Sequence, residues 1–157
     1  MCCPGLGGAE GRWYYEAVLL TDGLMQIGWA DDRFACDPVR GQGVGDHAHS
    51  WAVDGFRQKR WCLSSTTYGE RWQTGDVLGC LVDLDLNEMR FSLNGRDLGV
   101  AFRGVRVQGL FPGWHAGASM SLQRWGLAIE LRHRRTASTL RELDERRALG
   151  PRDEWDL

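Results

Sequence analysis

The sequence predicts an all-β protein, built as a sandwich or a barrel, and three observations lead to this fold class. Glycine is frequent, at 21 of 157 residues, proline is rare at 4, and eight tryptophans supply bulky core side chains. No segment before residue 125 has the apolar period of an amphipathic helix. The stretch from Gly75 to Gly99 has the pattern of a β-meander, which favours a protein that presents loops to a partner.

The first half of the chain alternates aromatic or aliphatic runs with turns that contain glycine, as strands and their connections do. The expected strands are residues 12–20, 24–30, 50–54 and 59–63. The expected connections are a turn at 21–23, a loop over 31–46, a turn at 54–55 and a polar loop over 64–74. The loop over 31–46 is predicted because it contains three glycines and a proline, which interrupt regular structure.

The second half begins with the meander. Two apolar-rich runs, 77–84 and 88–93, flank a polar turn at 85–87, and Asn94-Gly95 supplies positive φ for a second tight turn. Residues 99–102 are expected to lead into a loop, and residues 109–112 to open another short strand, with a continuation through 116–122 left open. Near the end, Thr139 and Glu142 form a capping box, and Gly150-Pro151 ends a short helix expected over 140–149.

Charge and cysteine usage narrow the class of partner. A net charge of −2 gives no electrostatic attraction to nucleic acid or to an anionic membrane. No apolar run is long enough to span a bilayer, and the first residues lack the pattern of a signal peptide. Five cysteines form no regular disulfide framework, which favours reduced thiols. We therefore expect a cytoplasmic protein with no nucleic-acid partner and no membrane span.

The sequence shows no assembled catalytic or metal-binding motif. His47 and His49 beside Asp46 have ligand spacing, but no further cluster of cysteine or histidine accompanies them. Glycines 41, 43 and 45 do not match the dinucleotide-binding fingerprint, and neither a nucleophile elbow nor a phosphate-binding loop is present. We therefore predict a protein that is not an enzyme and that has no cofactor and no metal.

An ordered set of motifs over residues 11–122 resembles the SPRY domain family. The motifs include Trp13-Tyr14-Tyr15-Glu16, Gln26-Ile27-Gly28-Trp29, Ser50-Trp51-Ala52-Val53-Asp54-Gly55, Gly75-Asp76-Val77-Leu78-Gly79, Phe91-Ser92-Leu93-Asn94-Gly95 and Leu110-Phe111-Pro112. These motifs are most similar to those in SPRY domains of RING-finger ubiquitin ligases and of ryanodine receptors. The resemblance implies a bent, concanavalin-like antiparallel β-sandwich without catalysis, which binds a protein or peptide through loops at one end.

On this interpretation the chain divides into a flexible N-terminus (1–10), a SPRY-like sandwich (11–131) and a basic, charged tail with a short helix (132–157). The sequence departs from the family because the usual Asn-Phe-Gly-like ending is missing. Residues 127–131 are a candidate for the last strand, and without it one sheet would have an unpaired edge. No RING ligand spacing is present, so the chain is expected to be a receptor or adaptor in ubiquitin ligation, with ligase components as partners, and no ligase by itself.

The candidate partner-binding residues are aromatic and charged side chains in expected loops: Arg33, Phe34, Asp37, Arg40, Arg57, Tyr68 and Trp114. In the SPRY interpretation the loop over 31–46 borders the binding face, where arginine pairs with carboxylates or peptide carbonyls. Tyr68 and Trp114 are expected to be anchors because a loop gives an aromatic ring little to pack on. The alternative for each is an ordinary solvated or packed loop residue, whereas Trp13, Trp29, Trp51 and Trp72 are expected in the core.

Two other function classes remain open from the sequence. A two-sheet fold rich in tryptophan could bind carbohydrate by stacking indole rings on sugars. A SPRY module could also be a structural segment of a large channel or scaffold, packed on neighbouring domains.

Overall fold

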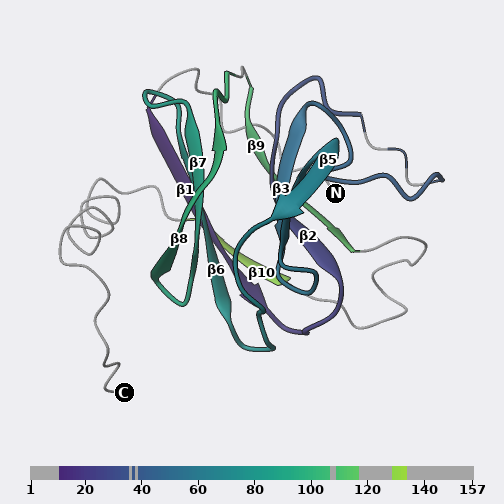
Figure 1. Ribbon diagram of the computed structural model, residues 1–157, viewed down its shortest axis with the longest axis vertical. Coiled ribbons are helices and arrows are strands. Elements are labelled where there is room, and N and C mark those ends of the chain that lie inside the picture. Colours follow the sequence, from purple (N-terminus) through teal and green to yellow (C-terminus); the bar gives the residue numbers. More distant parts are fainter. Residues whose placement is uncertain (1–10, 36, 38, 107–108, 117–128, 134–157) are drawn as a thin grey trace.

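The computed structural model describes residues 11–35, 37, 39–106, 109–116 and 129–133. These residues form an antiparallel β-sandwich of two five-stranded sheets (Figure 1). The all-β sandwich predicted from the sequence is therefore confirmed. The described part of the chain contains no helix that is long and apolar enough to cross a membrane.

Sheet A has the strand order β10-β1-β6-β7-β8. Its strands are β1 (Arg12–Leu19), β6 (Val77–Asp83), β7 (Glu88–Leu93), β8 (Arg96–Arg103) and β10 (Ile129–His133). Sheet B has the order β5-β4-β3-β2-β9. Its strands are β2 (Met25–Ala30), β3 (Ser50–Asp54), β4 (Lys59–Cys62), β5 (Ser64–Thr67) and β9 (Phe111–Ala116). Strands β5 and β8 are therefore edge strands of the described sheets.

Large apolar side chains from both sheets fill the space between them. Tyr15 from β1 and Trp29 from β2 are fully buried, and their rings meet edge to face at 4.9 Å between centroids. The Tyr15 hydroxyl donates a hydrogen bond to the Gly28 carbonyl at 2.5 Å. At Gly28, a Cβ atom would lie 1.9 Å from the Trp51 carbonyl oxygen, so the contact between β2 and β3 requires glycine. The core assignment of Trp13, Trp29 and Trp72 is confirmed, and Trp51 is partly buried against the core.

The meander forms as predicted, and it continues further than the sequence pattern indicated. Asn94 and Gly95 have φ values of 51° and 80°, which the tight turn requires. The chain then continues into β8 over Arg96–Arg103, where the sequence predicted only residues 99–102 leading into a loop. Asp97 and Gly99 concealed this strand because they interrupt its apolar pattern, and its pairing with β7 contains register shifts.

Two further expectations about loops are corrected. Residues 64–74 were expected to be a loop, but Ser64–Thr67 form the edge strand β5, which pairs with β4. Its side chains are polar because an edge strand needs no apolar face. Trp114 was also expected in a loop, but it lies in β9 with its backbone paired opposite Ile27.

The last strand of sheet A is present. Strand β10, Ile129–His133, pairs with β1 from Leu19 to Tyr15, so a segment overlapping the predicted residues 127–131 covers the edge of β1. The expected N-terminal segment 1–10 and the helix over 140–149 lie outside the described residues.

Candidate functional site

The strand directions place the predicted site residues at opposite ends of the sandwich. Strand β2 ends at Ala30 and β3 begins at Ser50, and these two residues are paired, so residues 31–49 lie at one end. We call this the long-loop end. It also includes the turn at Leu63, whose N–H donates to the Gly45 carbonyl at 3.1 Å. The opposite, hairpin end consists of residues 20–24, 55–58 and 68–76, joined by a hydrogen bond from the Tyr68 N–H to the Gln58 carbonyl at 2.9 Å.

A buried carboxylate organises the long-loop end. Asp31 is fully buried, and its Oδ1 accepts a hydrogen bond from the Arg33 backbone N–H at 2.9 Å. Its Oδ2 lies 2.9 Å from His49 Nδ1 and 3.6 Å from the Arg33 guanidinium. Because a buried carboxylate is stable only with such partners, Asp31 ties the beginning of the loop to its end. The two ends of the loop are thereby joined where β2 ends and β3 begins.

The other predicted residues of this loop are also held locally. Asp37 Oδ1 accepts the Arg40 backbone N–H at 3.1 Å, and its Oδ2 lies 3.5 Å from the Arg40 guanidinium. The Phe34 ring packs edge to face on the His47 ring at 6.0 Å between centroids. The Arg33 and Arg40 side chains are 63% and 78% exposed, so most of their five N–H donors face solvent. The structure thus brings Arg33, Phe34, Asp37 and Arg40 to one end, as the sequence analysis expected of one loop.

Three exposed apolar side chains also lie at the long-loop end. Among the described residues, five large apolar side chains are exposed, and Val39, Leu63 and Leu86 are the three at this end. The turn that carries Leu86 belongs to it because the Asn87 carbonyl accepts the Val105 N–H at 3.1 Å, and Val105 precedes β9, whose first residue, Phe111, is paired with Ala30 at this end. Apolar surface beside guanidinium donors is a combination that suits recognition of a peptide or protein.

The hairpin end holds Arg57. Its guanidinium pairs with the buried Asp54 carboxylate and lies 4.2 Å from the centre of the Trp61 ring. Asp54 Oδ1 also accepts hydrogen bonds from the backbone N–H groups of Phe56 and Arg57, so Arg57 is part of the turn's own structure.

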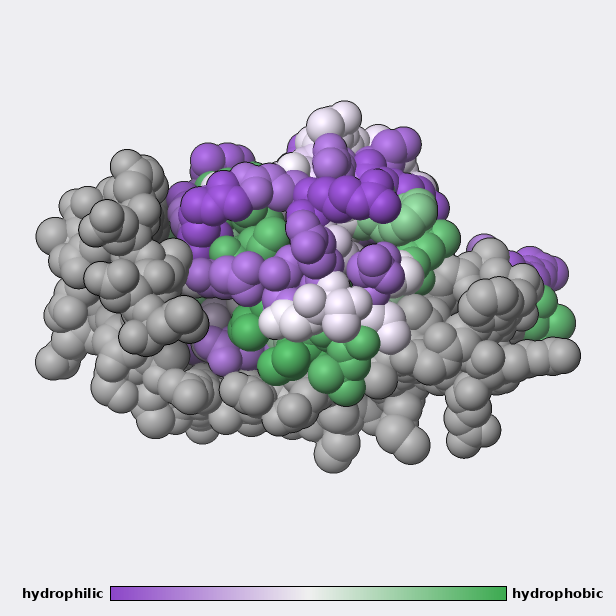
Figure 2. All heavy atoms as spheres, turned by 90° about the horizontal axis from the view of Figure 1, so that it is seen from below, coloured by the Kyte–Doolittle hydropathy of each residue, from purple (hydrophilic) through white to green (hydrophobic). Residues whose placement is uncertain are grey.

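Figure 2 views the molecule from below. This is the side on which the turn between β1 and β2, at the hairpin end, lies in Figure 1. The surface on this side has hydrophobic areas interspersed with hydrophilic ones.

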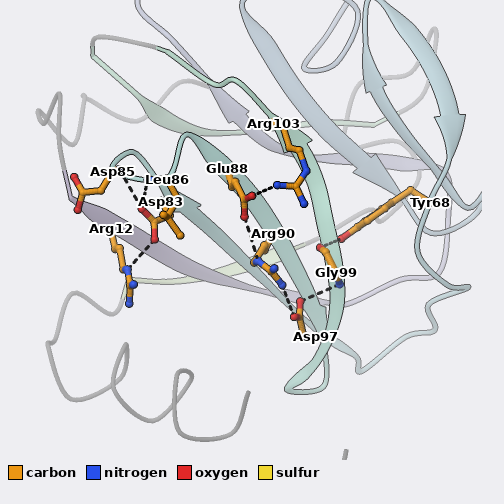
Figure 3. Close-up of polar contacts among 10 residues, drawn as sticks. All are labelled: Arg12, Tyr68, Asp83, Asp85, Leu86, Glu88, Arg90, Asp97, Gly99 and Arg103. Atoms are coloured by element: carbon orange, nitrogen blue, oxygen red, sulfur yellow. Dashed lines mark hydrogen bonds and ion pairs between the residues drawn. The ribbon is translucent and has the colours of Figure 1, made fainter. Parts of the chain in front are cut away.

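Tyr68, also at the hairpin end, joins the two sheets. Its hydroxyl donates to the Gly99 carbonyl on β8 at 2.7 Å, as Figure 3 shows, and its ring lies 6.3 Å from the Phe91 ring. Burial raises the pKa of Tyr68 above its ordinary value. The expectation that this ring has little to pack on was therefore wrong. Whether it also contacts a partner stays a prediction, as it does for the whole set of candidate residues.

His47 and His49 contact each other and Asp31, and Cys62 is half-buried. His47 Nδ1 accepts the His49 backbone N–H at 3.2 Å, while His49 Nδ1 faces Asp31. Over the described ranges, no group of three metal-ligating side chains could hold an ion. Burial raises the pKa of the Cys62 thiol, which lowers the thiolate fraction a nucleophile requires.

The outer face of sheet A carries a row of alternating charges. Arg103 pairs with Glu88, Glu88 lies 3.8 Å from Arg90, and Arg90 donates to Asp97 at 2.6 Å (Figure 3). At one end of the sheet, Arg12 pairs with Asp83 at 2.8 Å. Because each of these arginines has a carboxylate partner, the row binds β7 to β8 and leaves little unbalanced charge.

Two residues in key positions were not singled out in the sequence. Asp31 could have been recognised, because an aspartate that begins a glycine-rich loop often accepts a backbone N–H two residues later. Arg60 was not among the candidate residues. Its position on the inner face of β4 depends on the register between β3 and β4, which no local pattern encodes.

Comparison with known proteins agrees with this architecture. The SPRY domain family model matches residues 12–125. The E3 ubiquitin-protein ligase RKP of Arabidopsis thaliana is 42% identical over 112 residues, which cover 71% of this chain and 9% of the relative. The ATP-dependent RNA helicase Ddx1 of Drosophila melanogaster is 34% identical over 94 residues, covering 60% of this chain and 12% of the relative. The chain therefore spans about a tenth of the length of these relatives.

Proposed function

The chain belongs to the SPRY domain family of protein-interaction modules, and from this premise we propose that it binds a protein or peptide through its long-loop end as a substrate receptor or adaptor in ubiquitin ligation. The proposed binding face contains Arg33, Phe34, Asp37 and Arg40. The proposed compartment is the cytoplasm. The thiols of Cys62 and Cys80 are free, which suits a reducing environment.

The observation that carries the choice of face is the coincidence of exposed apolar and cationic side chains at one end of the sandwich. Val39 is 94% exposed and adjoins Arg40 in the chain, and Leu63 is 68% exposed at the same end. An interaction face needs apolar area to bury and directed donors to fix the register of the partner. The buried Asp31 supplies preorganisation, because its contacts with Arg33 and His49 join the two ends of the loop before a partner binds.

The ligase role is supported by a relative and not by the geometry. The relative named an E3 ubiquitin-protein ligase shares 42% identity with the chain, and the match covers 9% of its length. The other relative is named an RNA helicase, so SPRY domains of this similarity occur in proteins of more than one class. For this reason the receptor role and the binding face need one experiment that tests them separately.

The experiment compares two substitutions of the same chemical kind at opposite ends. Val39→Asp places a charge on the long-loop end, and Leu20→Asp places one at the hairpin end, where Leu20 is 48% exposed. Tagged wild-type and variant chains are expressed in cells, and the co-purified proteins are identified by mass spectrometry and probed for ubiquitin. Thermal unfolding of each purified chain shows whether both variants remain folded.

The proposal expects proteins that are retained by wild type and by Leu20→Asp but lost from Val39→Asp, with a ubiquitin-ligase component among them. Loss from Leu20→Asp alone would overturn the choice of face. Retention of partners with no ligase component and no ubiquitylated protein would overturn the receptor role. A chain that retains no partner in any form would instead favour a structural segment packed within a larger protein.

A further inference from the structure

Arg60 differs from most arginines of the described sandwich. It is half-buried, and among the residues that the structure describes no carboxylate pairs with it. Its guanidinium instead donates to the Ala101 carbonyl of β8 and lies 5.6 Å from the centre of the Phe102 ring. A guanidinium that has lost part of its hydration without gaining an anionic partner is a favourable position for a carboxylate from outside.

The register of sheet B explains why Arg60 faces inward. Arg60 is paired with Val53, a core residue, and with Thr66 on the other side, so these three side chains lie on the same face. Cys62 and its partner Ser64 follow two residues along on that face. The inner face of a sandwich is ordinarily apolar. Here it becomes polar at the β4–β5 edge, and the two sheets do not close on each other there.

A groove of about 440 Å³ lies at this open side. It is lined by Arg60, Cys62, Ser64 and Thr66 from sheet B and by Val100, Phe102 and Arg103 from β8. The lining offers two guanidiniums, two hydroxyls and an aromatic ring, and none of its residues is acidic. The guanidinium of Arg103 also pairs with Glu88, so Arg60 carries the unbalanced charge. The groove is therefore complementary to an anionic group.

The two edge strands beside the groove are not equally available. On β8, the carbonyls of Gly99 and Ala101 already accept hydrogen bonds from Tyr68 and Arg60. Strand β5 pairs with β4 alone among the strands that the structure describes, and its residues Ser64, Thr66 and Thr67 are exposed. An exposed strand edge with free backbone groups can accept a further strand from another chain.

We propose that the β5–β8 groove binds an extended segment of a partner protein, which adds to the edge of β5 and places an acidic side chain against Arg60. The backbone of the segment supplies hydrogen bonds to β5. Its carboxylate completes the ion pair that Arg60 lacks, with the hydroxyls of Ser64 and Thr66 as further donors. This groove adjoins the long-loop end at Leu63 but shares no residue with the binding face proposed above, so the two surfaces can be tested independently.

The test uses a matched pair of substitutions on β5. Thr66→Glu puts a carboxylate on the inner face opposite Arg60, where it neutralises the guanidinium and blocks the groove without removing the contact of Arg60 with β8. Thr67→Glu adds the same charge on the outer face of the same strand, opposite Lys59. Both positions are exposed, so both variants are expected to fold.

The probe is a synthetic peptide in which valine and glutamate alternate, compared with a peptide in which valine and glutamine alternate. Each is titrated into isotope-labelled chain, and backbone amide shifts are followed by NMR. The proposal expects saturable shifts in β5 and β8 with the glutamate peptide, weakened by added salt because the contact is electrostatic. Thr66→Glu should weaken binding about tenfold, as loss of one charge-assisted contact does, while Thr67→Glu and Val39→Asp should bind like wild type.

Several results would overturn the proposal. These are the absence of saturable shifts, equal binding of the glutamine peptide, equal weakening by Thr67→Glu, or shifts confined to residues 31–49. The last result would support the long-loop end instead. A failure of Val39→Asp to release partners in cells would leave the groove result unaffected, so the two proposals fail separately.

Discussion

Replacement of Tyr68 separates its structural role from any role in binding. Tyr68→Phe removes the hydroxyl that donates to the Gly99 carbonyl at 2.7 Å, and one hydrogen bond of this kind contributes about 1 kcal/mol. Tyr68→Ala also removes the ring that packs against Phe91 and the core. The free energy of unfolding should then fall by about 3 kcal/mol in total, at the low end for loss of an aromatic ring because the side chain is only partly buried. Phe56→Ala is the control, since Phe56 is an exposed aromatic residue at the same end.

The assay is urea unfolding followed by tryptophan fluorescence, with the free energy of unfolding extrapolated to water. With a typical slope of about 2 kcal/mol per molar urea, Tyr68→Phe should lower the midpoint by about 0.5 M and Tyr68→Ala by about 1.5 M. Phe56→Ala should change it by much less. If Tyr68→Ala were as stable as wild type, the ring would not belong to the core and its assignment as a sheet-to-sheet contact would be refuted.

Two further predictions concern the core. Burial raises the pKa values of Tyr14, Tyr15 and Tyr68, the three tyrosines of the chain, so the folded state holds these protons more tightly than the unfolded state. The stability that these tyrosines contribute is complete below about pH 10 and is lost as the pH rises above it. Phenolate absorbance should therefore appear together with alkaline unfolding. A reversible titration of the tyrosines at a pH below that of unfolding would contradict their burial. Gly28→Ala should destabilise the protein by about 3 kcal/mol or more, because its Cβ would lie 1.9 Å from the Trp51 carbonyl oxygen. Urea unfolding measures this loss, and a change below about 1 kcal/mol would show that the backbone of β3 can move away.

Local chemistry was enough to predict the fold class and many element positions. The turn at Asn94-Gly95 is predictable because only a few residue types adopt positive φ, and the structure has it there. Strands β1, β2 and β7 are predictable because their apolar side chains face a common core. Strand β5 was missed because its four residues, Ser64–Thr67, carry no apolar signal, and they become a strand only through pairing with β4.

For the candidate site, too, one part could be predicted from the sequence and another could not. Arg33, Phe34, Asp37 and Arg40 lie in one loop, so their proximity follows from the chain itself. Sequence order could not show that Arg57 and Tyr68 lie at the opposite end, because that depends on the directions in which β2, β3 and β4 run.

Turn chemistry and apolar alternation act over a few residues, so they are enough to predict a β-sandwich, and the ordered motifs are enough to recognise the SPRY family. What each polar residue faces depends on how the strands pair and the sheets pack. Asp31 became the buried anchor of the long loop, Tyr68 became a contact between sheets, and Arg60 came to lie in a groove without a carboxylate. The physical reason is that strand register and sheet packing bring together residues far apart in the chain, and one shift of register would reverse the face on which each side chain lies.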